Sequence, residues 1–242
     1  MKRRVVAFAV AVAVVASAPG AFADKIGIAA AVKNDVTASL AGAAQPLATG
    51  NDVFSNQRIR TGTASTAQLL FLDETSVSVA PQSEIVLDRF VYNPNRGAGN
   101  VVLTTGRGAF RFVTGAQNPT NYTIKTPVAT IGVRGTIVEI RNAIINGQMV
   151  SIITLLEGSL EIRTISGEIG RLTQVGLSFV VGADGKLQGP INTHGSTYAF
   201  TGDPKRFEPN DNRLDLNDAL FSLGSKPPPV APQSRGNFST NF

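Results

Sequence analysis

The segment Tyr122–Thr136 constrains the fold of this chain more than any other stretch. It reads YTIKTPVATIGVRGT: a strand-like lead-in, a break at Thr126 and Pro127, and then a run in which Gly132 and Gly135 flank an arginine. Glycine accepts backbone angles that other residues avoid. We therefore predict a corner at which two glycines let the chain bend, and no catalytic chemistry requires this order of residues.

The region from Gln68 to Val180 has a β pattern throughout. Short runs of Val, Ile, Leu, Phe and Thr are separated by turn residues, which is typical of consecutive strands. Asn146-Gly147, between two apolar runs, is the strongest short signal for a hairpin, and Asp184-Gly185 is a second one. We predict an all-β domain from this region.

Several short strands of this region follow a glycine, but their spacing is too uneven for a strict solenoid period. This arrangement favours a stacked, sequential architecture, which we describe as a coiled sandwich or an irregular β-helix of short strands. Towards the N-terminus, we expect an early strand to run through residues 33–37.

The first residues are typical of a secretory signal. Lys2, Arg3 and Arg4 precede an uncharged apolar run, and Ala21-Phe22-Ala23 offers the small-x-small pattern of a cleavage site. The apolar run is shorter than the ~20 residues that span a bilayer, which favours cleavage over a retained anchor. We predict a cleaved signal peptide over 1–23, no transmembrane anchor afterwards, and a periplasmic or secreted protein of a Gram-negative bacterium.

Charge and cysteine content exclude several classes of function. The signal holds three of the 22 Lys and Arg residues and none of the 17 Asp and Glu residues, so the rest carries 19 minus 17, or +2. This balance does not indicate nucleic-acid binding. The chain has no cysteine, which excludes disulfides and thiol chemistry, and its single histidine excludes multi-histidine metal sites.

The composition changes after about residue 200. Pro, Asn and Asp break regular structure from Asp203 onward, although leucines between Leu214 and Leu223 could form one short amphipathic helix. We predict a β domain over 24–200, followed over 201–242 by a tail that holds this short C-terminal helix and is disordered from Lys226.

The chain resembles the FecR-like domain family from about Gly50 to Gly182. The matching motifs, in chain order, are Gly50–Val53, Arg58–Gly62, Ala67–Thr75, Ala80–Glu84, Leu103–Phe112, Thr126–Thr136 and Leu156–Ile162. Glu74 stands where the family usually has glycine. The structural signature of this resemblance is carried by Thr126, Pro127, Gly132, Arg134, Gly135 and Thr136.

The resemblance implies a non-enzymatic, extracytoplasmic β domain. FecR-like domains are known chiefly as the periplasmic part of anti-sigma regulators, which also carry a cytoplasmic sigma-binding segment and one membrane helix. This chain begins instead with a signal-like segment, so it is similar to the stand-alone secreted members. Transmembrane signalling by this chain alone is therefore not expected.

Three arginines are the candidate binding residues. Arg134 is either a ligand-binding cation or a structural arginine that ties carbonyls or a carboxylate at the corner; Asp73, Glu84 and Glu157 are its possible partners. Alternation in residues 107–113 places Arg107 and Arg111 on the face opposite Phe110 and Phe112. These two arginines could bind an anionic glycan or a partner's carboxylates, or form a solvated face.

Other polar groups have simpler explanations. Asp73-Glu74 and Glu84 with Asp88 could be the paired carboxylates of a glycosidase, but we interpret them as turn residues. Residues 210–218 come nearest to a calcium loop, and His194 lies in a turn-like stretch without a nucleophile elbow. We expect no catalytic residue, no metal and no cofactor.

The sequence thus predicts a protein that acts by binding. The expected partner is an envelope or outer-membrane protein, contacted by exposed sheet edges, through strand addition, or by outward strand faces, with a role linked to signalling or surface assembly. The alternative is recognition of a polysaccharide such as peptidoglycan, which the scarcity of tyrosine and the absence of tryptophan disfavour. An exported hydrolase is a third hypothesis, for which the sequence offers no catalytic constellation.

Overall fold

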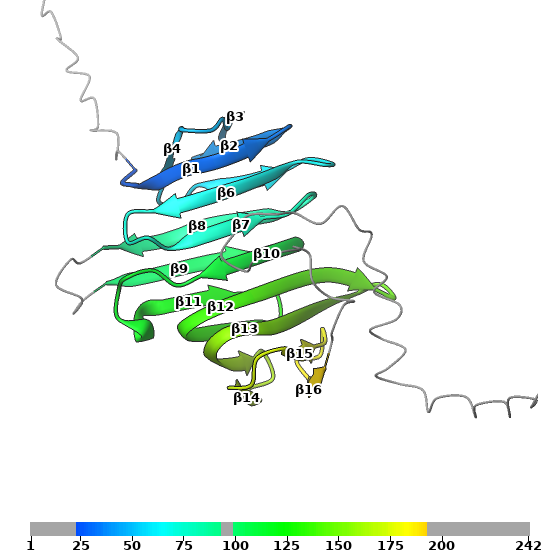
Figure 1. The fold of residues 1–242 in the computed structure, drawn as a ribbon. Coiled ribbons are helices and arrows are strands. Elements are labelled where there is room, and N and C mark those ends of the chain that lie inside the picture. Colours follow the sequence, from blue (N-terminus) through cyan, green and yellow to red (C-terminus); the bar gives the residue numbers. More distant parts are fainter. Residues whose placement is uncertain (1–22, 93–98, 193–242) are drawn as a thin grey trace, which may run out of the picture.

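The computed structural model describes residues 23–92 and 99–192, which consist almost entirely of β-strands (Figure 1). The one helical element in these ranges is the 3-10 turn η1 (Pro119–Asn121). No helix within them is long and apolar enough to cross a membrane. The all-β prediction is confirmed, whereas the expected signal peptide, C-terminal helix and tail lie outside the described residues.

The strands form one 16-stranded sheet that curls so that its two halves face each other (Figure 1). We call these halves layer A and layer B. Two long strands, β12 (Ala129–Ile145) and β13 (Gln148–Thr164), belong to both layers.

Each layer has seven further strands. In the order of pairing, β12 and β13 stand between β11 and β14 in layer A and between β10 and β15 in layer B. Layer A contains β3 (Ala43–Pro46), β2 (Val36–Leu40), β5 (Arg58–Thr61), β8 (Glu84–Val91), β9 (Asn100–Thr105), β11 (Tyr122–Lys125) and β14 (Ile169–Leu172). Layer B contains β4 (Asp52–Phe54), β1 (Lys25–Lys33), β6 (Thr66–Phe71), β7 (Ser76–Val79), β10 (Gly108–Val113), β15 (Leu177–Val181) and β16 (Leu187–Asn192).

The two long strands cross from one layer to the other at a shared bend. The first half of β12 pairs with β11 in layer A, its second half pairs with β10 in layer B, and the pairing of β12 with β13 shifts register between Arg134 and Val138. Gly135 has φ +55° and Gly158, on β13, has φ +80°. A Cβ atom on Gly158 would lie 1.9 Å from the carbonyl oxygen of Gly135, so only glycine fits there.

The predicted corner is therefore present, but one of its two glycines differs from the prediction. Gly135 bends the chain as expected, whereas Gly132 lies in regular strand pairing between Thr123 and Glu161. The second glycine of the bend, Gly158, comes from the facing strand and is 23 positions away in the sequence. The corner is a property of two paired strands rather than of one segment.

The turns follow the sequence signals in most places. Asn146 (φ 50°) and Gly147 (φ 76°) form the two-residue hairpin between β12 and β13, and Asp184-Gly185 lies in the turn between β15 and β16. The early strand expected over residues 33–37 is wrong. The chain turns there between β1 and β2, because Asn34 adopts a φ of 59°, a conformation that asparagine tolerates.

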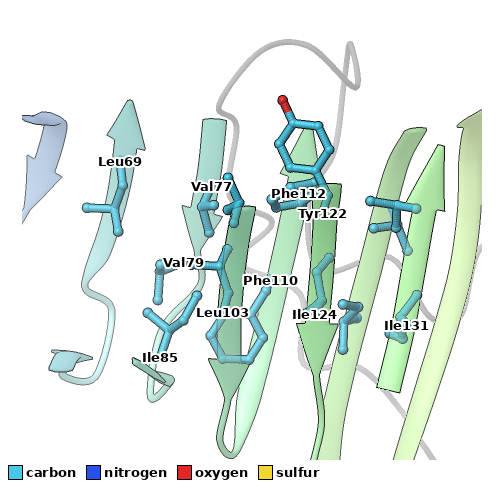
Figure 2. Packing of buried hydrophobic residues seen from close by; sticks show 14 of the residues in the cluster. Leu69, Val77, Val79, Ile85, Leu103, Phe110, Phe112, Tyr122, Ile124 and Ile131 are labelled. Carbon is cyan, nitrogen blue, oxygen red and sulfur yellow. The ribbon is translucent and has the colours of Figure 1, made fainter. Parts of the chain in front are cut away.

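The core lies between the two layers and is filled by alternate side chains of both (Figure 2). Phe112 of layer B meets Tyr122 of layer A edge to face, with ring centroids 5.9 Å apart, and Phe71 meets Phe90 in the same way at 5.6 Å. Burial of apolar area contributes about 25 cal/mol per Å². A continuous core of this kind stabilises the fold in a chain without disulfides.

The bend predicts a specific sensitivity to substitution. We expect Gly158→Ala to lower the free energy of unfolding by about 3 kcal/mol or more, because the new Cβ would clash with the Gly135 carbonyl and the backbone would be strained. Urea unfolding followed by circular dichroism measures this. Gly132→Ala is the control: its Cβ would meet no atom within 4 Å, so we expect a change below about 1 kcal/mol. Equal losses in both variants would contradict this account of the bend.

Candidate functional site

The outward side of layer A carries many charged side chains. Along β5, β12 and β14, inward residues are buried and outward residues are exposed. Residues paired directly across neighbouring strands share a face. The pairing register therefore aligns outward side chains in rows that cross layer A.

Seven cations stand at these outward positions, where the register aligns two carboxylates with them, Glu84 and Glu161. A further carboxylate of this layer, Asp88, lies beside Arg89 where β8 is irregular. The cations are Arg58, Arg60, Arg89, Lys125, Arg134, Arg163 and Arg171, and all are exposed. We call this surface the cationic face.

Three of these cations form ion pairs. Glu84 accepts from both Arg58 and Arg60, and Glu161 accepts from Nε of Arg171 at 2.8 Å. Within residues 23–92 and 99–192, no ion pair involves the other four, which are Arg89, Lys125, Arg134 and Arg163. The cationic face thus has positive charge that its own carboxylates do not neutralise.

A cavity of about 470 Å³ opens on this face beside the bend. Its lining includes Arg134 on β12, Ser159 and Glu161 on β13, and Arg171 and Thr173 at β14. We call it the corner cavity. It combines two guanidinium groups with hydroxyl groups, a set of donors suited to carboxylate or phosphate oxygens.

Gly132 explains why the sheet is hollow at this place. It occupies an outward position between Thr123 and Glu161, where neighbouring rows carry side chains. A Cβ atom built on Gly132 would meet nothing within 4 Å. The missing side chain leaves the open space of the corner cavity, which is the local role of this signature glycine.

Thr136 holds the bend that forms one wall of the cavity. Its N–H donates to Oγ1 of Thr114 (2.9 Å), and its own Oγ1 donates to the carbonyl of Ser159 (2.7 Å). The same Oγ1 accepts from the N–H of Arg134 (2.9 Å). Thr136 is 1% exposed, so these bonds are shielded from water and fix the backbone of Arg134.

A buried carboxylate, Asp73, is hydrogen-bonded to Tyr122, which also lines the corner cavity. Asp73 accepts hydrogen bonds from Thr75 (2.9 and 3.0 Å), Gln117 (3.0 Å) and the Tyr122 hydroxyl (3.0 Å). Burial raises the pKa of Tyr122 to about 12, and the nearby Asp73 charge adds to that shift. Glu74, beside Asp73, adopts a φ of 69°, so it keeps the backbone conformation that the glycine usual at this position would favour.

Arg134 lies at a position from which its side chain can reach a ligand, as the interpretation of this residue as a binding cation requires. The residue is exposed and lines the corner cavity. Two of its expected partners are engaged elsewhere, since Glu84 pairs with Arg58 and Arg60 and Asp73 bonds Tyr122. Within residues 23–92 and 99–192, no ion pair involves the side chain of Arg134. Its backbone N–H, which donates to Thr136, helps to stabilise the bend.

Arg111 lies elsewhere, on layer B, and is 3% exposed. Its Nε and Nη2 donate to Oε1 of Glu139 at 3.0 and 2.5 Å. The solvated strand face that the alternation favoured is wrong for Arg111, because β10 is buried on both sides from Ala109 to Phe112. Its burial also argues against direct contact with a partner.

Arg107 is exposed in the turn between β9 and β10, and its carbonyl accepts from the N–H of Glu84 (3.0 Å). This turn lies at the strand ends that are farthest from the bend. The structure therefore does not bring Arg107, Arg111 and Arg134 together in one site.

Thr126 and Pro127 also lie at the strand ends far from the bend, in the turn between β11 and β12. Oγ1 of Thr126 accepts from the N–H of Ala129 (3.0 Å) and from the hydroxyl of Ser151 (3.1 Å). Thr126 is the organising residue of this turn, while Pro127 is exposed. The signature thus runs from the turn before β12 to the bend within β12, that is, from one end of the layer A strands to the other.

Most of the cationic face was not identified from the sequence. Two segments contain the alternation that would predict parts of it. In Ser159–Thr164, Glu161 and Arg163 lie on the face opposite Leu160 and Ile162. In Arg58-Ile59-Arg60, the two arginines lie on the face opposite the isoleucine. Joining these segments into one face requires the pairing register, which a single sequence does not supply.

Two of the acidic residues considered for catalysis have other partners: Asp73 accepts from Tyr122, and Glu84 pairs with Arg58 and Arg60. No cluster of three or more His, Cys, Asp and Glu residues exists within residues 23–92 and 99–192. His194 and residues 210–218 lie outside the described residues.

The match to one family model agrees with the sequence resemblance. Residues 57–161 match the family model described as "FecR protein". Two crystal structures of a "putative anti-sigma factor" from Parabacteroides distasonis ATCC 8503 are similar, at 15% and 14% identity with TM-scores of 0.42 and 0.41. Each similarity covers 54% of this chain and 57% of the other. The comparison with curated proteins gave no match.

The buried ion pair predicts that Arg111 acts on stability. We expect Arg111→Met to lower the free energy of unfolding by about 3 kcal/mol, because the substitution leaves the buried Glu139 without this cation. The measurement is urea unfolding at neutral pH. Arg107→Met, which removes an exposed arginine, serves as the control and should change stability by less than about 0.5 kcal/mol. A stable Arg111→Met protein would overturn the structural role.

Proposed function

We propose that this chain, which carries a FecR domain over residues 57–161, is a non-catalytic binding module that works outside the cytoplasm. Its partner is an envelope or outer-membrane protein, and its setting is the periplasm or the exterior of a Gram-negative bacterium. The single observation that carries the proposal is the exposed cationic face, on which the corner cavity opens.

The chemistry of this face supports binding over catalysis. Arginine stays protonated in proteins, so Arg134 and Arg171 donate hydrogen bonds but do not serve as general bases. Their planar groups suit the recognition of carboxylates by charge and geometry. Such a site holds an oxyanion without transferring protons to or from it.

Export is supported by the sequence alone. The positive residues Lys2–Arg4, the apolar run and the Ala21-Phe22-Ala23 pattern have the order of a secretory signal. An interaction module that begins this way would meet its partner in the envelope. A role in signalling or in surface assembly is consistent with that location.

The outward face is favoured over the sheet edges as the contact surface. The terminal strands β3, β4 and β14 have only four, three and four residues. β3 ends at Pro46 and β16 contains Pro190. Short edges with proline are a common protection against strand addition, so docking on the cationic face is the simpler mode.

Polysaccharide recognition is the second candidate. It is favoured by one observation: Thr120, Ser159 and Thr173, which carry hydroxyl groups, line the corner cavity. These groups could bond sugar hydroxyls as well as carboxylates. A polysaccharide therefore has to be offered to the protein alongside envelope proteins.

We predict that the protein, used as bait on a detergent-solubilised envelope, enriches one envelope protein reproducibly in mass spectrometry. Isolated peptidoglycan serves as a parallel bait. The control is a variant with Lys125→Glu and Arg163→Glu, two exposed cations of the cationic face that form no ion pair among the described residues. Capture should fall with this variant because the substitutions reverse charge on the contact surface. Co-sedimentation with peptidoglycan and no protein partner would contradict the proposal in favour of glycan recognition.

A further inference from the structure

We infer that the cationic face binds an acidic, extended segment of the partner protein, and that the corner cavity receives its carboxylates. This inference rests on the proposed function and adds to it the chemistry of the partner. It starts from charge. The seven cations outnumber the two carboxylates of the face, and four of the cations lie outside every ion pair of the described residues.

The positions of Arg134 and Arg171 match the repeat of an extended chain. Arg134 lies two residues along β12 from Gly132, and Arg171 lies two strands across from Gly132, through Glu161. With strand spacing near 4.8 Å and a rise near 3.3 Å per residue, their Cα atoms are on the order of 12 Å apart. Two long side chains that line one cavity from these positions can hold carboxylates about 7 Å apart, the separation of alternate residues in an extended segment.

The residues that line the cavity have N–H and O–H groups that can donate hydrogen bonds to such a ligand. Glu161 accepts from Nε of Arg171 at 2.8 Å, and a guanidinium has five N–H donors. This ion pair orients Arg171 without using all its donors. Ser159 and Thr173 add hydroxyl groups to the lining, and Gly132 leaves open space above the sheet.

The outward residues favour an acidic protein segment over an acidic polysaccharide. Along the described strands from β5 to β14, the outward positions that the pairing register aligns hold charged, hydroxyl, amide, aliphatic and glycine residues, with no aromatic ring among them. The aromatic residue in the lining of the corner cavity, Tyr122, is 1% exposed and belongs to the core. Sugar rings commonly stack on aromatic side chains, and that platform is missing here. Carboxylates need only the charge and the N–H donors that this face provides.

The direct test is fluorescence anisotropy with a labelled peptide of alternating glutamate and threonine, which is extended and has carboxylates on one side. The full chain is titrated at about 0.05 M and about 0.5 M salt, because exposed charge pairs are screened at the higher ionic strength. A peptide of alternating lysine and threonine and a polyuronate chain are the comparison probes. We expect the acidic peptide to bind at low salt, to bind more weakly at high salt, and to displace the polyuronate.

Three variants locate the binding. Arg134→Glu with Arg171→Glu should raise the Kd for the acidic peptide at least about tenfold, and Gly132→Phe should weaken binding by filling the cavity without changing charge. Lys33→Glu with Lys186→Glu changes net charge equally, at exposed positions of layer B that do not line the corner cavity, and should leave Kd within about twofold. Equal effects of the two double variants, or no binding of the acidic peptide, would overturn the inference. Binding of the polyuronate that the peptide cannot displace would assign the face to a saccharide instead.

The same variants separate this inference from the proposed function. If the wild-type protein captures an envelope protein and Arg134→Glu with Arg171→Glu captures it equally well, the inference fails and the binding module stands. If the wild-type protein captures none, the proposed function fails. Loss of capture in this variant alone, with Lys33→Glu and Lys186→Glu unaffected, supports both.

Discussion

The close approach of Gly158 to the carbonyl of Gly135 is the contact on which the rest of this structure depends. Because neither position has a side chain, two paired strands can bend together and pass from one layer to the other. Thr136 secures that bend with three hydrogen bonds, two through its hydroxyl and one through its N–H. One pair of strands, β12 and β13, thereby joins the two layers around a single core (Figure 1). A flat sheet of the same strands would leave one apolar face in water.

The bend also determines the surface that the protein offers. Because successive side chains of a strand point to opposite faces, the residues between the buried core residues of layer A point outward. The register then gathers cations from β5, β8, β11, β12, β13 and β14 on one face. Gly132 is the exception in its row, and it leaves a hollow beside the two arginines of the corner cavity. Under the proposed function, binding and folding thus use neighbouring residues of one signature: Gly132 and Arg134 line the corner cavity, while Gly135 and Thr136 form the bend.

Local signals predicted most of the strands, because runs of β-branched and apolar residues favour them. They also predicted the hairpin at Asn146-Gly147 and the bend at Gly135, because both depend on the residues in the turn itself. Non-local pairing accounts for what sequence reasoning missed. Gly158 is a corner residue only because it faces Gly135. Arg111 alternates like a surface residue, yet it is buried against Glu139 of the next strand. The cationic face required the register of several strands, and a single sequence does not contain that register.

The most direct test of a binding face on layer A is site-specific photo-crosslinking in living cells. A photoreactive amino acid placed at Thr130, an exposed outward position of layer A, is compared with one at Leu70, which is 40% exposed on layer B. The account predicts a discrete adduct with an envelope protein from position 130 and none from position 70. An adduct from position 70 alone would contradict it, because the partner would then dock on the opposite layer.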